Sequence, residues 1–376
     1  MIKKFLSILH LSNLAYNLSK LCCRIKTQQM DYKESLDLLN DYSKDSHGSC
    51  ICEHNFNEID CDVEIIVPCY NVEKYVEYCI QSILAQKTQY KFFVTIVNDG
   101  STDGTSDILK KYEGLNGIKV LTQRNTGLSG ARNAGIAQAH GRYLMIVDSD
   151  DLLYEHAIEK LVSLAEKTCA DVVDSGHIRF ADKINGESLK AKIYDYFQKP
   201  QALPYNEHSS WITGFPCGKI FKRDIFARIE FPRGYWFEDT LVCMIIEPFC
   251  KIKATSDILS FAYRMNMNSI SHVSKGSPKS LDGMYITLQL LRDRKTLNIP
   301  FSSVADYEMI LKQIIINHKR IIHLPKNIQN AAFIVHSEII CNEFCNFRTS
   351  NESLKLVEKF LKNKDFRAFY IYCKWH

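Results

Sequence analysis

Residues 63–71 read VEIIVPCYN, and this stretch sets the pattern that the next hundred residues repeat. Its first five residues are a nearly continuous apolar run, which is typical of a short strand buried in a parallel sheet. The run ends at Pro68. A helix is expected next, because apolar side chains from Val72 to Leu84 recur at helical spacing, and Asn71 is its expected N-cap.

Strands and helices alternate outward from this stretch, with short connections between them. Further strands are expected at residues 92–97, 118–121 and 143–147, and helices at residues 127–140 and 155–167. This alternation predicts a parallel sheet joined by right-handed crossovers. The fold class is therefore α/β, a Rossmann-type sandwich with a mostly parallel sheet.

Polar clusters follow three of these strands, at Pro68–Asn71, Asn98–Thr102 and Asp148–Asp151. In parallel sheets, ligands bind beyond the carboxyl ends of the strands. Asp148 and Asp150 offer hard oxygen ligands that suit Mg²⁺ or Mn²⁺ beside a diphosphate. The alternative is a polar turn that caps the next helix.

Two further side chains suit a nucleotide site. Asp99 could accept a hydrogen bond from a base or a ribose, and Arg132 could reach phosphate oxygens, although a surface salt bridge is its alternative. The sequence contains no phosphate-binding G-x-x-x-x-G-K-[ST] loop, no G-x-G-x-x-G after the first strand and no G-x-S-x-G elbow. A dinucleotide enzyme and an α/β-hydrolase are therefore not expected.

Four motifs resemble the catalytic domain of glycosyltransferase family 2. They are VPCYN, NDGSTDGT, NTGLSGARNAG and DSDD, which begin at Val67, Asn98, Asn125 and Asp148 and follow one another in the family's order. The resemblance implies a GT-A fold and an inverting transfer from a nucleotide sugar, with Mn²⁺ or Mg²⁺ as cofactor. It extends over about residues 62–175, and more loosely to residue 275.

The resemblance also implies a role for individual residues. Asp239 would be the catalytic base, with Glu238 as its neighbour or as an acceptor ligand, and capping of the following helix is the alternative for this pair. Asp150 would bind the metal, with Asp148 and, in a late loop, His272 beside it. The residues expected to bind the nucleotide sugar are Pro68, Tyr70, Glu73, Asp99, Arg132, Asp148 and Lys219.

The expected donor is a UDP sugar by family tendency, and the expected acceptor is a saccharide or lipid-linked hydroxyl in cell-surface polysaccharide synthesis. A net charge of +4 gives no reason to expect nucleic acid as a partner. Two alternatives are a non-catalytic nucleotide-binding subunit of a glycan-synthesis complex and a sugar nucleotidyltransferase. The second usually has a Gly-rich basic loop after its first strand, which VPCYN does not provide.

Three parts are expected along the 376 residues. Residues 1–61 form an N-terminal amphipathic helix and a linker, residues 62–276 the catalytic domain, and residues 277–376 a helical region that packs on the catalytic domain or forms a homodimer. The helices of this last region are expected at residues 280–297, 304–324, 328–347 and 354–369.

Residues 1–26 carry only positive charges on a helical pattern that is too polar to span a bilayer. This segment lies either on an anionic membrane surface or on the protein itself.

The 14 cysteines are scattered, with no signal peptide before them, and indicate free thiols in a reducing cytosol. The expected location is the cytoplasm, with peripheral attachment to the inner membrane face as an option. Zinc is not expected in the linker, because its candidate ligands lack a standard spacing: His47, Cys50, Cys52, His54 and Cys61.

Overall fold

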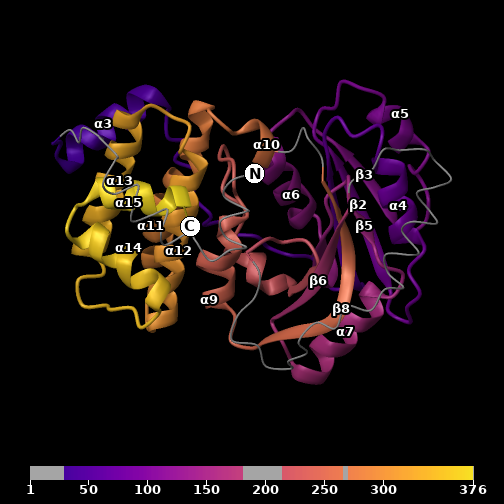
Figure 1. The fold of residues 1–376 in the computed structure, drawn as a ribbon. Coiled ribbons are helices and arrows are strands. Elements are labelled where there is room, and N and C mark those ends of the chain that lie inside the picture. The colour runs from indigo at the N-terminus through magenta and orange to yellow at the C-terminus, as the bar shows by residue number, and fades with distance from the viewer. Residues whose placement is uncertain (1–28, 181–213, 266–269, 376) are drawn as a thin grey trace.

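The computed structural model describes residues 29–180, 214–265 and 270–375. Within these residues one sheet of eight strands lies beside a group of C-terminal helices, with the sheet on the right in Figure 1. The strand order across the sheet is β3-β2-β1-β4-β7-β6-β8-β5. The strands are β1 (Cys61–Cys69), β2 (Phe92–Asn98), β3 (Ile118–Thr122), β4 (Gly141–Ile146), β5 (Leu152–Leu153), β6 (Val172–Phe180), β7 (Lys219–Lys222) and β8 (Lys253–Arg264).

The first half of the sheet is parallel, as the alternation of apolar runs predicts. β1 pairs in parallel with β2 and β4, and β2 pairs in parallel with β3. The second half is mixed, because β7 runs antiparallel to both β4 and β6. The predicted α/β fold class is confirmed, whereas β5 to β8 follow no alternation that the sequence shows.

Helices cover both faces of the sheet, and successive residues of β1 show why. Ile65 packs with α4 (Val76–Leu84), α5 (Thr105–Lys110) and α7 (Ala157–Thr168), while Ile66 faces α6 (Gly127–Ala137) on the other side. Neighbouring side chains of a strand point to opposite faces, so both must be apolar. α6 lies very close to the sheet, since a Cβ at Gly135 would come within 2.5 Å of Ile66.

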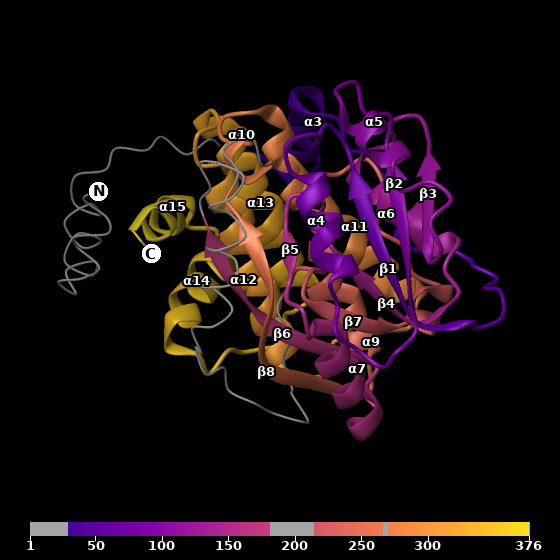
Figure 2. The ribbon, with the colours of Figure 1, turned by 90° about the vertical axis from the view of Figure 1, so that its right-hand side faces the viewer.

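The C-terminal helices cover the α6 side of the sheet and join its core without a break. They are α11 (Asp282–Thr296), α12 (Val304–Arg320), α13 (Lys326–Asn342), α14 (Glu352–Lys362) and α15 (Phe366–Trp375), and a short 3₁₀ helix, Pro278–Leu281, precedes them. The helix α3 (Tyr32–Tyr42) packs on α13 (Figures 1 and 2), so segments from both ends of the described chain lie side by side.

Two local expectations were wrong. Asn71 is not an N-cap: its φ is 53°, its side chain bonds a neighbouring loop, and α4 begins five residues later. The single helix expected at residues 354–369 is two helices, because the chain turns at Lys364, which adopts a φ of 52°. The helix expected after Asp239 is present, but its middle part is a π-helix, Val242–Ile246, which the short α9 (Glu247–Phe249) follows.

The three-part division of the chain stays a prediction, but the segment expected to be a linker packs closely on the rest of the protein. Cys50 is fully buried and its N–H donates to Asp293 of α11 at 2.8 Å, while Ile51 forms a β-bridge with Ile229. The described cysteines are free thiols, and none of the linker cysteines or histidines belongs to the close group of potential metal ligands described below.

The predicted amphipathic helix at residues 1–26 lies outside the described residues. Among the residues that the structure describes, no helix is long and apolar enough to cross a bilayer.

Candidate functional site

A cleft of about 710 Å³ opens where β1, β2 and β4 end. Side chains from all four motifs line it, together with Ile270 at the start of α10 (Ile270–Val273). The predicted site residues that line the cleft are Pro68, Tyr70, Glu73, Asp99, Asp148 and Asp150. Four others lie away from its lining: Arg132, Lys219, Glu238 and Asp239.

The loops after β1 and β2 are joined by hydrogen bonds that shape one wall of the cleft. The Asn71 side chain accepts a hydrogen bond from the Thr102 N–H at 2.8 Å, and Glu73 accepts one from the Gly104 N–H at 2.7 Å. Tyr70 stands beside this wall with 49% of its surface exposed. An aromatic ring that is left exposed in a cleft can stack on a planar base.

Asp99 is held in one position by the loop that leads into α6. Its Oδ1 accepts hydrogen bonds from the Thr126 N–H at 2.9 Å and from the Gln123 amide at 2.7 Å. The residue is 2% exposed, yet it lines the cleft. A carboxylate fixed in this way is preorganised to accept a further hydrogen bond from a ligand.

Arg132 connects the cleft to a second acidic segment. Its guanidinium donates to Asp148 at 2.8 Å and to Glu238 at 2.5 Å, although these residues are far apart in the sequence. Arg132 is 2% exposed, so these two carboxylates supply its charge compensation in the described structure. The expectation that Arg132 contacts phosphate stays a prediction, and the two carboxylates occupy both ends of its guanidinium.

Arg264, the last residue of β8, forms hydrogen bonds with the DSDD segment. The Arg264 N–H donates to Asp151 Oδ1 at 2.8 Å, and the Arg264 side chain donates to the Asp150 carbonyl at 2.7 Å. The guanidinium lies between the rings of Tyr75 and Phe180, at 4.7 and 4.6 Å from their centroids. Arg264 therefore orients the acidic turn through backbone and ring contacts.

The acidic turn has the donor set of a divalent cation site. Asp148 and Asp150 face the cleft, and Asp151 is fully buried with no hydrogen-bond partner for Oδ2 among the described residues. Asp148, Asp151 and Cys217 each place a ligand atom within 4.8 Å of the others. Burial, with the charges of Asp150 and Asp148, raises the pKa of Asp151 well above its ordinary value. A cation would relieve that repulsion, so the residues fit a metal.

The second acidic segment, residues 235–239, precedes the π-helix. Glu238 is 5% exposed, whereas Asp239 is partly exposed and its Oδ1 is buried. Burial raises the pKa of both carboxyl groups, and the charge of Arg132 opposes this rise for Glu238. For Asp239 the main opposing charge is Arg320 of α12, a residue that no sequence motif indicated.

The remaining predicted residues take different places. Lys219 is fully buried, and its Nζ pairs with Asp174 at 2.8 Å and lies 4.6 Å from the Phe215 ring centroid. Burial lowers the pKa of Lys219. His272 belongs to α10, but its side chain is outside the described residues. Their predicted roles stay predictions.

Residues 64–230 match the family model described as Glycosyl transferase family 2. The uncharacterized glycosyltransferase EpsJ of Bacillus subtilis (strain 168) is 42% identical over 223 residues, which cover 56% of this chain and 63% of EpsJ. The putative teichuronic acid biosynthesis glycosyltransferase TuaG of the same organism is 39% identical over 152 residues, which cover 39% of this chain and 56% of TuaG. The chain thus spans less than two thirds of the length of each of these relatives.

The fold also resembles a solved structure, S. aureus TarS 1-349 in complex with UDP-GlcNAc. The two superpose with a TM-score of 0.55 at 17% sequence identity, over 82% of this chain and 89% of that one. At this identity the likeness supports the fold alone.

Proposed function

Residues 64–230 belong to glycosyltransferase family 2, and we propose that the chain transfers a sugar from a nucleotide-sugar donor to an acceptor hydroxyl with inversion at the anomeric carbon. The observation that supports this most is the cleft at the strand ends. It gathers Tyr70 and Asp99 with Asp148 and Asp150 of the acidic turn in one space of about 710 Å³. A pocket of this size can hold a nucleotide sugar.

Within this proposal, Tyr70 stacks on the base, and Asp99 accepts a hydrogen bond from the base or the ribose. Asp148 and Asp150 would hold Mn²⁺ or Mg²⁺, which supplies positive charge for the departing diphosphate. Arg132 keeps Asp148 in place and ties its position to Glu238.

The transfer step needs a base on the acceptor side. The acceptor oxygen attacks C1 from the face opposite the leaving group, its bond to C1 forms, and the bond from C1 to the phosphate oxygen breaks. The nucleoside diphosphate leaves with the electron pair of that bond. The acceptor proton passes to the carboxylate of Asp239, a residue that is partly exposed.

We propose a UDP sugar as the donor, and TarS, described in complex with UDP-GlcNAc, supports starting the search there. The name of TuaG supports an acceptor in cell-surface polysaccharide synthesis, either a saccharide or a lipid-linked one. A cytoplasmic location, peripheral on the membrane through residues 1–26, completes the proposal.

A panel of UDP, GDP and dTDP sugars tests this proposal, with Mn²⁺ or Mg²⁺ and release of nucleoside diphosphate as the measurement. The wild type should turn over one donor class. Asp239→Asn should lower turnover about 1,000-fold, within the range for loss of a general base, while leaving nucleotide binding intact. Asp150→Ala should lower turnover and also weaken nucleotide binding in the presence of metal.

Two results would contradict the assignment. Acceptor-dependent turnover that survives both substitutions would exclude these roles for Asp150 and Asp239. Nucleotide binding without turnover in the wild type, across the panel and with a range of saccharide acceptors, would favour a non-catalytic nucleotide-binding subunit.

A further inference from the structure

The segment that carries Glu238 and Asp239 is held by parts of the chain beyond residues 64–230. The Trp236 N–H donates to Asp282 of α11 at 2.7 Å, and Lys279 donates to the Gly234 carbonyl at 2.8 Å. From the N-terminal side, Asp45 accepts a hydrogen bond from the Tyr235 hydroxyl at 2.8 Å. The sheet alone therefore does not determine where this segment lies.

Phe237 shows how strongly the segment is constrained. Its φ is 65°, a left-handed conformation that costs an aromatic residue about 1–2 kcal/mol. The guanidinium carbon of Arg320, on α12, lies 3.6 Å from the centroid of the Phe237 ring. This contact is a close cation–π stack. Arg320 thus packs against the backbone turn that presents Asp239 two residues later.

Arg320 also supplies the main positive charge near Asp239. Asp239 Oδ1 and Arg320 Nη1 are both buried, and neither has a hydrogen-bond partner among the described residues. α11 closes over the guanidinium, since a Cβ at Gly283 would come within 3.0 Å of Nη1. One carboxylate oxygen and one guanidinium nitrogen are thus left without a hydrogen bond in the protein interior, where opposite charges attract each other more strongly than they would in water.

The other charged or titratable groups around Asp239 come from several elements. Arg132 of α6 is the second positive charge, and Asp148 adds a negative one. Glu238 is adjacent in the chain, and burial together with the Asp239 charge raises the pKa of the Cys243 thiol in the π-helix. Arg132 is already engaged by two carboxylates, which leaves Arg320 as the cation available to Asp239.

We propose that Arg320 is a positioning residue for the transfer reaction, which keeps the Asp239 carboxylate ionised and aimed at the acceptor hydroxyl. The C-terminal helical region is then part of the active site. This inference rests on the proposed function, because it takes Asp239 as the base.

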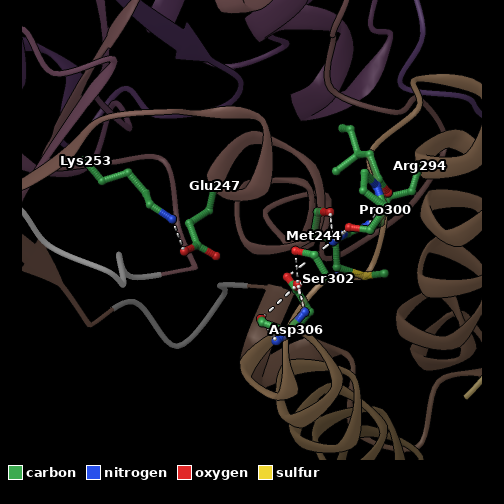
Figure 3. Close-up of polar contacts among 9 residues, drawn as sticks. Met244, Glu247, Lys253, Arg294, Pro300, Ser302 and Asp306 are labelled. Carbon is green, nitrogen blue, oxygen red and sulfur yellow. Dashed lines mark hydrogen bonds and ion pairs between the residues drawn. The ribbon is translucent and has the colours of Figure 1, made fainter. Parts of the chain in front are cut away.

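Arg294 provides a matched control. It is 1% exposed and lies on α11 in the same helical region, but its guanidinium donates to backbone carbonyls, at 3.0 Å to Met244 and at 2.8 Å to Pro300 (Figure 3). Replacing it removes a buried arginine and loosens the same helices, without removing the main charge that faces Asp239.

The kinetic test compares Arg320→Gln, Arg320→Lys and Arg294→Gln with the wild type. Arg320→Gln should lower kcat about 10-fold at a pH below the acidic limb, with the donor KM nearly unchanged, because the base is less often ionised. The acidic limb of its kcat profile should move to higher pH by about one unit. Arg320→Lys should restore part of kcat, and Arg294→Gln should leave the acidic limb where the wild type has it.

A thermal-unfolding cycle provides a readout that does not need activity. Wild type, Arg320→Gln, Asp239→Asn and the double variant are melted at pH 7.5. If the two groups form a pair, Asp239→Asn should lower the melting temperature less in the Arg320→Gln background than in the wild type. Additive changes, or an unmoved pH profile in Arg320→Gln, would overturn the inference. A wild type that transfers no sugar would instead overturn the proposed function. The thermal-unfolding cycle would then still show whether Arg320 and Asp239 interact.

Discussion

The cleft at the strand ends and the acidic segment at residues 235–239 are built in opposite ways. The wall of the cleft forms between neighbouring loops, as when Asn71 receives the Thr102 N–H and Asp99 receives the Thr126 N–H. The acidic segment is held from a distance, by Asp45 before the sheet and by Asp282 and Arg320 after it. The donor side of this proposed site is therefore local in sequence, and the acceptor side depends on the whole fold.

Arg132 is the link between the two regions, and its removal should have the largest effect on stability. Arg132→Leu would leave Asp148 and Glu238 without their shared cation, which typically costs about 3–5 kcal/mol for a buried pair. Urea unfolding at pH 7.5 measures this loss. Arg142→Gln is the control, because Arg142 is 38% exposed beside Asp62 and Glu166, and its loss should cost under about 1 kcal/mol. If both variants lose the same free energy of unfolding, Arg132 does not link the cleft to the acidic segment.

The helical region should be more sensitive to acid than the motif-bearing sheet. His318 of α12 and His336 of α13 are each 1% exposed, and burial lowers their pKa values to about 3 and about 4. The positive charge of Lys326, and in acid that of a protonated His336, lower the pKa of His318 further. Both histidines are neutral in the folded protein at neutral pH.

In the unfolded chain the pKa of each of these histidines is about 6.5, so the unfolded chain binds protons more readily than the folded protein. Acid therefore favours unfolding. Stability falls as the pH drops below that value, by about 2 kcal/mol for each histidine at pH 5. Buried carboxyl groups with raised pKa values have the opposite effect, since they make the folded protein more stable as the pH falls. The contribution of the histidines is therefore measured as a difference between the wild type and a variant. Chemical unfolding of wild type and His336→Leu at pH 7.5 and pH 5 should show a smaller acid loss in the variant. His156→Gln, at a side chain that is 36% exposed, should retain the wild-type loss.

The sheet side has its own test, with a smaller expected effect. Gly135→Ala would place a methyl group within 2.5 Å of Ile66, so α6 would have to move away from β1. Overpacking of this kind costs about 1–3 kcal/mol. Ala137→Ser, at an exposed position of the same helix, should stay within about 0.5 kcal/mol in the same unfolding assay. If nucleotide binding weakens with Gly135→Ala while the pH profile of turnover is unchanged, the two regions are separable.

Much of the first region could be predicted from the sequence, because its signals are short in range. Val63–Val67 reads as a buried strand, and Asp148 and Asp150 directly follow another apolar run, so their place at the sheet edge follows from the alternation. Asn71 was misplaced because its side chain can cap a helix or bond a neighbouring loop, and only the packing of the two loops decides between these. The turn at Lys364 was missed for a similar reason, since the apolar spacing continues through it.

The second region could be predicted only in part. Glu238 and Asp239 were found through a family pattern, but nothing in the sequence pairs Glu238 with Arg132, or Asp239 with Arg320. Lys219 was expected to bind the nucleotide sugar, and the structure places it inside the protein beside Asp174. The sequence alone does not distinguish a lysine that contacts a ligand from one that pairs with a buried carboxylate.

By itself, the sequence determined the α/β class, the order of the parallel strands along the chain and the acidic turn at the end of β4. Those features depend on hydrophobic periodicity and on residues within a few positions of each other. Only the tertiary structure decided that α11 and α12 reach the segment of Asp239, and that Arg132 is shared by two acids. The contacts that decide this include Trp236 with Asp282 and Arg132 with Glu238, which are 46 and 106 positions apart. Such contacts depend on how packed elements meet, and no local pattern in the chain records that.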